Sequence, residues 1–163
     1  MIRLHDIDNR FRTFADSHPM LRAFSTGQMH DFNTGTDDEY PRMHVIYEGS
    51  QINEYTKAYQ FDVYFLSMPD SEHDEQRQMN IVSSMEAIAE DLLADIYKGK
   101  SVFVTDDENK EGQVNGGSDF GFDVQGGNMT PVLESTANVL CGVRLALTIE
   151  VAYRNDVSSN ILT

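Results

Sequence analysis

The feature of this sequence that most restricts its fold is the run from residue 139 to residue 153, where apolar side chains occupy every second position. Side chains of a β-strand point alternately to opposite faces, so the run predicts one long strand with one apolar face. That face carries Val139, Cys141, Val143, Leu145, Leu147, Ile149, Val151 and Tyr153. At ~3.3 Å per residue the strand is roughly 50 Å long, well above the ~17–20 Å of a usual strand. We expect its end to project past the core and to lie against a neighbouring subunit.

Two amphipathic helices are predicted from apolar residues spaced by three and four positions. The first carries Leu4, Ile7, Phe11 and Phe14, and it ends by residue 18 because Pro19 disfavours helical geometry in the residue before it. The second carries Ile81, Met85, Ile88, Leu92 and Ile96. Its single apolar stripe predicts packing on one face of a sheet.

The remaining segments predict strands and loops. Residues 42–48 and 55–68 form an expected antiparallel hairpin with a turn at Gly49–Ser50, and a weaker strand lies within residues 20–32. A short strand at 101–105 precedes a Gly-rich and Asp-rich stretch, 106–128, which predicts a long loop or hairpin excursion. Residues 154–163 read as a C-terminal arm. The expected fold is α+β, with a mostly antiparallel sheet and both helices packed on one face.

Composition limits the classes of partner. The chain has 163 residues, enough for one domain spanning 1–163, with 27 acidic and 12 basic residues and a net charge of -15. This balance argues against tight binding of nucleic acid or of anionic membranes, although an acidic wall lets DNA slide past without sticking. One cysteine, Cys141, permits no internal disulfide. With no signal-peptide pattern and no membrane-spanning run, we expect use in a cytoplasm or in something assembled there.

Known catalytic motifs are missing from the sequence. It holds no GxSxG, no phosphate-binding GxxxxGK[ST] and no His pair at i, i+4. Acidic clusters at 37–39 and 106–108 do not match the ligand spacing of an EF-hand loop. His44 in a strand fits a hydrogen-bonded structural imidazole better than a catalytic base. We therefore assign no catalytic residue, cofactor or metal ligand and expect a protein that is not an enzyme.

Several scattered segments resemble the tail-terminator or tail-completion proteins of tailed bacteriophages. The first two segments are the first helix with His18–Pro19, and Tyr40–Pro41 before the strand RMHVIYE. The third is the aromatic strand YQFDVYFLSMPD followed by the helix QMNIVSSMEAIAEDLLADI, which contains Ser84 and Asp91. The fourth is Thr130–Pro131 before the strand NVLCGVRLALTIEVAY, which contains Gly142. The resemblance implies a structural virion protein that assembles in the host cytoplasm. It implies a ring of six or twelve copies at the head–tail neck or tail end, contacting portal, adaptor and tail proteins while genomic DNA passes through.

The contact residues of such a ring are predicted from their position. Phe103, Phe120 and Phe122 lie in or beside the 106–128 excursion, and Arg144 and Glu150 lie on the mixed face of the long strand. Each has an alternative: the phenylalanines fold back on their own core, or the two charges face water. Two other functions stay open, a small α+β ligand-binding or enzymatic domain and a calcium-binding decoration module.

Overall fold

The computed structural model describes residues 3–27, 39–68, 75–97, 123–135 and 139–152. In chain order the elements are α1 (Leu4–Ser17), β1 (Ala23–Thr26), β2 (Arg42–Ile52), β3 (Thr56–Ser67), α3 (Glu75–Tyr97), β4 (Asp123–Ser135) and β5 (Val139–Ala152). The strands form one sheet in the order β1-β2-β3-β5-β4. Only β1 pairs in parallel, with β2, and the other neighbours are antiparallel. This confirms the predicted α+β class with a mostly antiparallel sheet.

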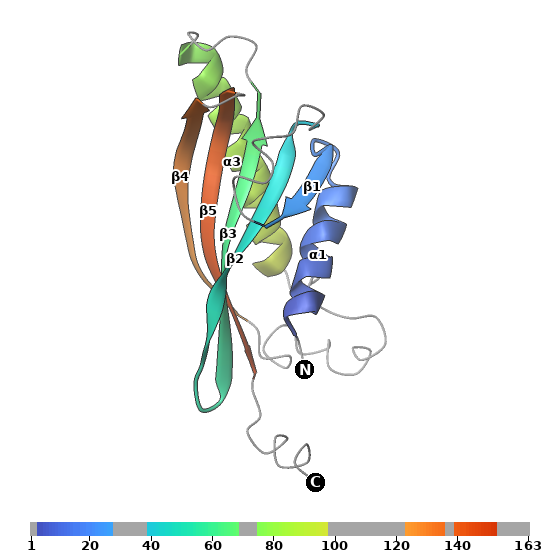
Figure 1. The fold of residues 1–163 in the computed structure, drawn as a ribbon, viewed down its shortest axis with the longest axis vertical. Helices are drawn as coiled ribbons and strands as arrows, with labels where there is room; N and C mark the ends of the chain where they lie inside the picture. Colours follow the sequence, from blue (N-terminus) through green and yellow to red (C-terminus); the bar gives the residue numbers. More distant parts are fainter. Residues whose placement is uncertain (1–2, 28–38, 69–74, 98–122, 136–138, 153–163) are drawn as a thin grey trace.

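Both helices pack on one face of the sheet, as predicted. Figure 1 shows α3 running along the strands at the middle of the sheet, while α1 lies beside β1. The predicted apolar stripes of α1 and α3 join the alternating apolar face of β3 and β5 in one core, where Phe11 meets Phe61 edge to face at 5.1 Å. Burying one such large apolar side chain contributes about 1.5–3 kcal/mol.

Strand β5 has the two faces that its sequence predicts. Its helix-side residues are buried from Val143, 0% exposed, to Val151, 1% exposed. Strand β3 pairs with β5 as far as Ala152, and β4 pairs with β5 as far as Glu150, so both edges of β5 are joined to strands of its own chain. The length of β5 is therefore matched within the chain. That its projecting end lies against a neighbouring subunit stays a prediction.

The hairpin of β2 and β3 forms as predicted, but its turn lies further along the chain. The strands are joined at residues 53–55, where the Asn53 N–H donates to the Thr56 carbonyl oxygen at 2.8 Å. Gly49 instead lies at a β-bulge with φ +130. A bulge can require a positive φ that glycine adopts without strain, so the Gly49–Ser50 pair marks an irregularity within β2 and no chain reversal.

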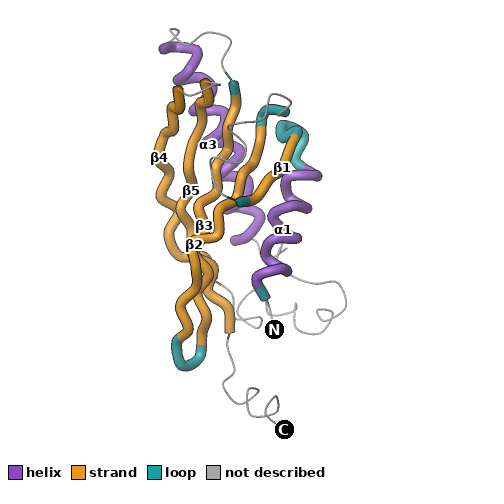
Figure 2. Tube along the Cα trace, viewed as in Figure 1, coloured by secondary structure: helices purple, strands orange, loops and turns teal. Residues whose placement is uncertain are grey.

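The hairpin end of the sheet extends past the helices. Figures 1 and 2 show the tip of the β2–β3 hairpin and the end of β5 projecting together beyond the N-terminal end of α1. At the far edge of the sheet, β4 begins at Asp123, so residues 123–128 of the predicted excursion belong to a strand. The rest of the excursion, the short strand predicted at 101–105 and the arm at 154–163 lie outside the described residues.

Gly142 permits the close pairing of β3 and β5, and we predict that Gly142→Ala destabilises the protein. A Cβ at this position would overlap the carbonyl oxygen of Phe65 and approach Leu66 Cα to 3.0 Å, both of them backbone atoms that cannot rotate away. We expect a loss of about 1–3 kcal/mol or more in the free energy of unfolding, measured by urea denaturation.

Thr148→Ala is the matched control, because Thr148 lies on the same face of β5 and is half-buried. We expect a change of about 0.5–1 kcal/mol for this variant. Equal stability losses in the two variants would contradict the steric role of Gly142.

Candidate functional site

The tip of the β2–β3 hairpin carries apolar side chains that the rest of the described chain does not cover. Ile52, the last residue of β2, is 57% exposed, and Tyr55 in the turn is 72% exposed. We call residues 52–55 the hairpin tip. Large apolar groups gathered at a projecting end are typical of a contact surface. The sequence did not predict this surface, because the turn was expected at Gly49–Ser50. With the turn at that position, Ile52 would not lie at the tip of the hairpin.

A row of aromatic rings braces the hairpin from the core outward. Phe11 of α1 contacts Phe61, and the Tyr47 ring lies 5.6 Å from Phe61 and 6.4 Å from Tyr59. The Lys57 ammonium then lies 4.9 Å from the Tyr59 ring centroid. Aromatic pairs at such separations contribute about 0.5–1.5 kcal/mol beyond their burial. The base of the hairpin is therefore packed against the core.

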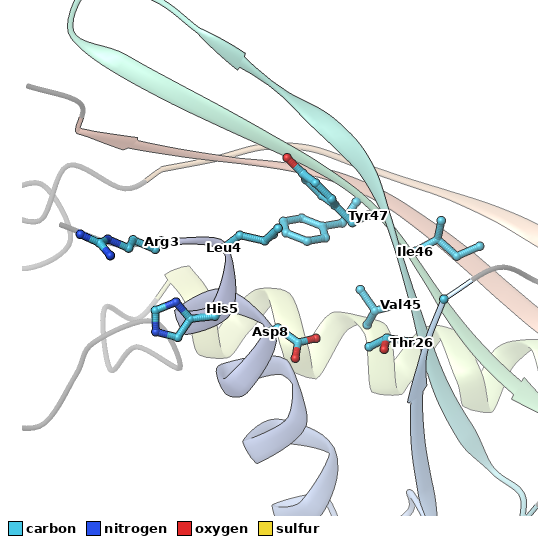
Figure 3. Close-up of a pocket in the computed structure, with 10 residues that line it drawn as sticks. Arg3, Leu4, His5, Asp8, Thr26, Val45, Ile46 and Tyr47 are labelled. Carbon is cyan, nitrogen blue, oxygen red and sulfur yellow. The ribbon is translucent and has the colours of Figure 1, made fainter. Parts of the chain in front are cut away.

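A hollow of about 660 Å³ opens at the base of the hairpin, and we call it the base pocket. Figure 3 shows Leu4 and Tyr47 on one side of it, with Asp8 and Thr26 on the other. Its walls are mostly apolar, while Arg3 and Asp8 bring charge and His5 an imidazole to its border. The Asp8 carboxylate already pairs with Arg12 at 3.5 Å.

The sheet face away from the helices carries a charged cluster at its centre. The Arg144 guanidinium lies 3.0 Å from the Asp62 carboxylate, and Glu48 at the bulge of β2 joins them through a hydrogen bond with Asp62. This hydrogen bond, followed by partial burial and by the charge of Asp62, raises the pKa of Glu48. The protonated Glu48 carboxyl can donate to the Asp62 carboxylate, so this cluster is sensitive to pH.

His44 lies on the open face of β2 but is only 1% exposed. Its Nε2 lies 2.9 Å from the Gly27 carbonyl oxygen, and its Nδ1 lies 2.7 Å from Ser25 Oγ. A carbonyl oxygen only accepts, so Nε2 carries a proton and, in a neutral ring, Nδ1 accepts from the Ser25 hydroxyl. The imidazole joins β1 to β2 and lines neither the base pocket nor the hollow beside Arg144. It matches the hydrogen-bonded structural histidine expected from sequence.

The structure brings together two residues that the sequence places far apart. His18, just after α1, points Nε2 at the Asp91 carboxylate of α3, 2.9 Å away. The other ring nitrogen of His18 accepts from the Met20 N–H at 3.1 Å. This contact joins the end of α1 to the C-terminal half of α3 within the helix layer.

The predicted contact residues divide into two groups. Phe103, Phe120 and Phe122 lie outside the described residues. Arg144 and Glu150 both lie on the open face of β5 and are half-buried. Arg144 pairs within its own chain, with Asp62, and Glu150 lies opposite Ala58 of β3.

Within the described residues, no group of three or more His, Cys, Asp or Glu side chains is placed to hold a metal ion. Of the acidic clusters considered for calcium, only Glu39 falls in a described segment. No helix in the described part of the chain is both long and apolar enough to cross a membrane.

No protein-family model matches this chain, and no curated protein matches it.

The charged cluster makes stability depend on pH, and we predict that Glu48→Gln stabilises the protein at neutral and alkaline pH. Folding raises the pKa of Glu48. The contribution of Glu48 to the free energy of unfolding is therefore fully present below its unfolded pKa and is lost as pH rises through its folded pKa. Glutamine keeps a donor for Asp62 at every pH. We expect the melting temperature to rise by roughly 1–3 °C at pH 8, and the difference to shrink towards pH 4.

Glu90→Gln, an exposed change on α3, is the control for the loss of one negative charge. An equal gain in melting temperature for both variants at pH 8 would attribute the effect to net charge and contradict a local role of Asp62.

Proposed function

We propose that this protein is a structural subunit of a homo-oligomeric ring in a tailed bacteriophage, at the head–tail neck or the tail end. Such a ring contains six or twelve copies, contacts portal, adaptor and tail proteins, and lets genomic DNA pass through its centre. It assembles in the host cytoplasm and remains in the virion. The observation that carries this proposal is the hairpin tip, where Ile52 and Tyr55 project into solvent on a braced extension of the sheet.

The hairpin tip supports association because its exposed apolar groups gain free energy when a partner covers them. Burying apolar surface contributes about 25 cal/mol per Å², and one aromatic residue buries about 150–250 Å². Tyr47, Tyr59 and Phe61 hold the base of the hairpin against the core. A surface that is ordered before it binds loses less conformational entropy on binding, which suits a contact repeated around a ring.

The charge of the chain supports the passage of DNA. The net charge of -15 disfavours tight contact with phosphates, and the open sheet face carries the carboxylates Glu48 and Asp62 beside one guanidinium. An acidic lumen would repel the duplex and keep it mobile.

The sheet edges favour docking through side chains over the addition of strands. At one edge, β4 contains Pro131, which has no N–H, and an irregularity between Gly126 and Asn128. At the other edge, β1 is only four residues long. Prolines, bulges and short edge strands all weaken strand addition. In this proposal the hairpin tip is therefore the main contact between copies.

The base pocket favours a second candidate, a small ligand-binding or enzymatic domain. Its volume of about 660 Å³ is within the usual range of ligand sites. His44, the imidazole that such a domain would most readily use, does not line it. A thermal-shift screen with small polar metabolites tests this candidate, and stabilisation that His5→Ala abolishes would support it.

We predict that the wild-type protein forms a ring of six or twelve copies, either alone or with portal or tail-tube protein. We expect the double variant Ile52→Ser and Tyr55→Ser to stay folded and to assemble at least tenfold more weakly, since the change removes the apolar surface of the hairpin tip. Light scattering after size-exclusion chromatography measures both properties.

Met79→Ser is the matched control, since Met79 is also well exposed, at 64%, but lies on α3. We expect this variant to assemble like the wild type. A wild-type protein that stays monomeric with every partner would contradict the proposed function.

A further inference from the structure

The hairpin tip and the base pocket are two different surfaces of the same chain. The tip presents Ile52 and Tyr55 outward, whereas the base pocket lies between the first turn of α1 and β2 near Tyr47. Four residues of β2 lie between Tyr47 and Ile52, and the five steps at ~3.3 Å each span roughly 17 Å of extended chain. Figure 1 shows the hairpin pointing away from the helices. A tip on this stiff extension cannot fold back into its own pocket.

The two surfaces match in size and polarity. The base pocket has apolar walls from Leu4, Tyr47 and Phe61, and about 660 Å³ is enough for an aromatic ring and an aliphatic side chain together. The hairpin tip offers one of each, Tyr55 and Ile52. An aromatic anchor that enters a largely preformed apolar pocket is typical of the residues that dominate binding energy at protein interfaces.

The charges at the two surfaces also match. The hairpin tip carries Glu54, and the mouth of the base pocket carries Arg3 and His5. The Asp8 carboxylate of the pocket is offset by its pair with Arg12, and His5 Nε2 lies 3.2 Å from the Asp6 carboxylate. Arg3 is therefore the cation at this mouth that can face Glu54 of another copy, and opposite charges across a contact favour its register.

We propose that the hairpin tip of one copy docks in the base pocket of the next copy. Tyr55 and Ile52 enter between Leu4, Tyr47 and Phe61, and Glu54 lies towards Arg3. Because the tip and the pocket differ, the contact is heterologous and leaves one free tip and one free pocket at the ends of any open chain. Such a contact is completed only by closing into a ring. This inference rests on the proposed ring function and names the surfaces that join its subunits.

Disulfide trapping tests this contact. Asn53→Cys and Thr26→Cys are made in separate preparations, because Asn53 lies in the hairpin tip, Thr26 lines the base pocket and both positions are exposed. The native Cys141 is buried, and a wild-type mixture controls for its reaction. We expect mixed oxidation to give a dimer of one copy of each variant at least tenfold above the yield from either variant alone.

A charge exchange gives a second readout without cysteine. Arg3→Glu and Glu54→Lys each place like charges across the proposed contact, so each alone should raise the concentration for half-assembly at least fivefold. The double variant restores the opposite signs across the same contact and should return this concentration to within twofold of wild type. Circular dichroism confirms that each variant is folded.

The outcomes separate this inference from the function on which it rests. A ring that forms in the wild type while the mixed disulfide fails, or while Asn53→Cys forms tip-to-tip disulfides instead, overturns the docking contact and leaves the ring function standing. A charge exchange without rescue also counts against docking. A protein that never assembles, even with portal or tail-tube protein, overturns both.

Discussion

Burial of one sheet face beneath two helices is the interaction on which the rest of the structure depends. At ~1.5 Å per residue, the 23 residues of α3 span roughly 35 Å and the 14 residues of α1 roughly 21 Å. At ~3.3 Å per residue, β5 spans roughly 46 Å. The helices are therefore too short to cover the full length of the sheet. The parts of β2, β3 and β5 that extend beyond the helices form the projecting hairpin end (Figure 1).

The projecting end stays ordered because neighbouring strands and rings support it. Strand β3 pairs with β2 on one side and with β5 on the other. Both pairings reach the hairpin end of β3, where Lys57 lies opposite Ile52 and Thr56 lies opposite Ala152. The rings of Phe61, Tyr47 and Tyr59 continue the core outward along its base. Strand pairing and aromatic packing thus support an extension that the helices alone do not cover.

The sequence predicted the elements whose apolar periods agree with their burial. The stripe from Ile81 to Ile96 and the alternation of β5 each identify a buried face, since burial imposes these periods directly. The hairpin turn was misplaced because glycine serves both turns and bulges, and only the pairing of β2 with β3 distinguishes the two for Gly49. The base pocket has no local signal, because Leu4, Thr26 and Phe61 meet only after the chain folds.

The two edge strands of the sheet, β1 and β4, disfavour the addition of further strands, and this affects the behaviour of the protein at high concentration. A folded protein at high concentration stays dispersed only if the strand edges of its copies do not pair with one another. Exposed strand edges would let copies stack into fibres through backbone hydrogen bonds, irrespective of side chains. Pro131 and the irregularity beside Gly126 weaken that route along β4. The β4 edge therefore resists association through backbone hydrogen bonds, and any contact between copies there depends on side chains, which can distinguish one partner from another.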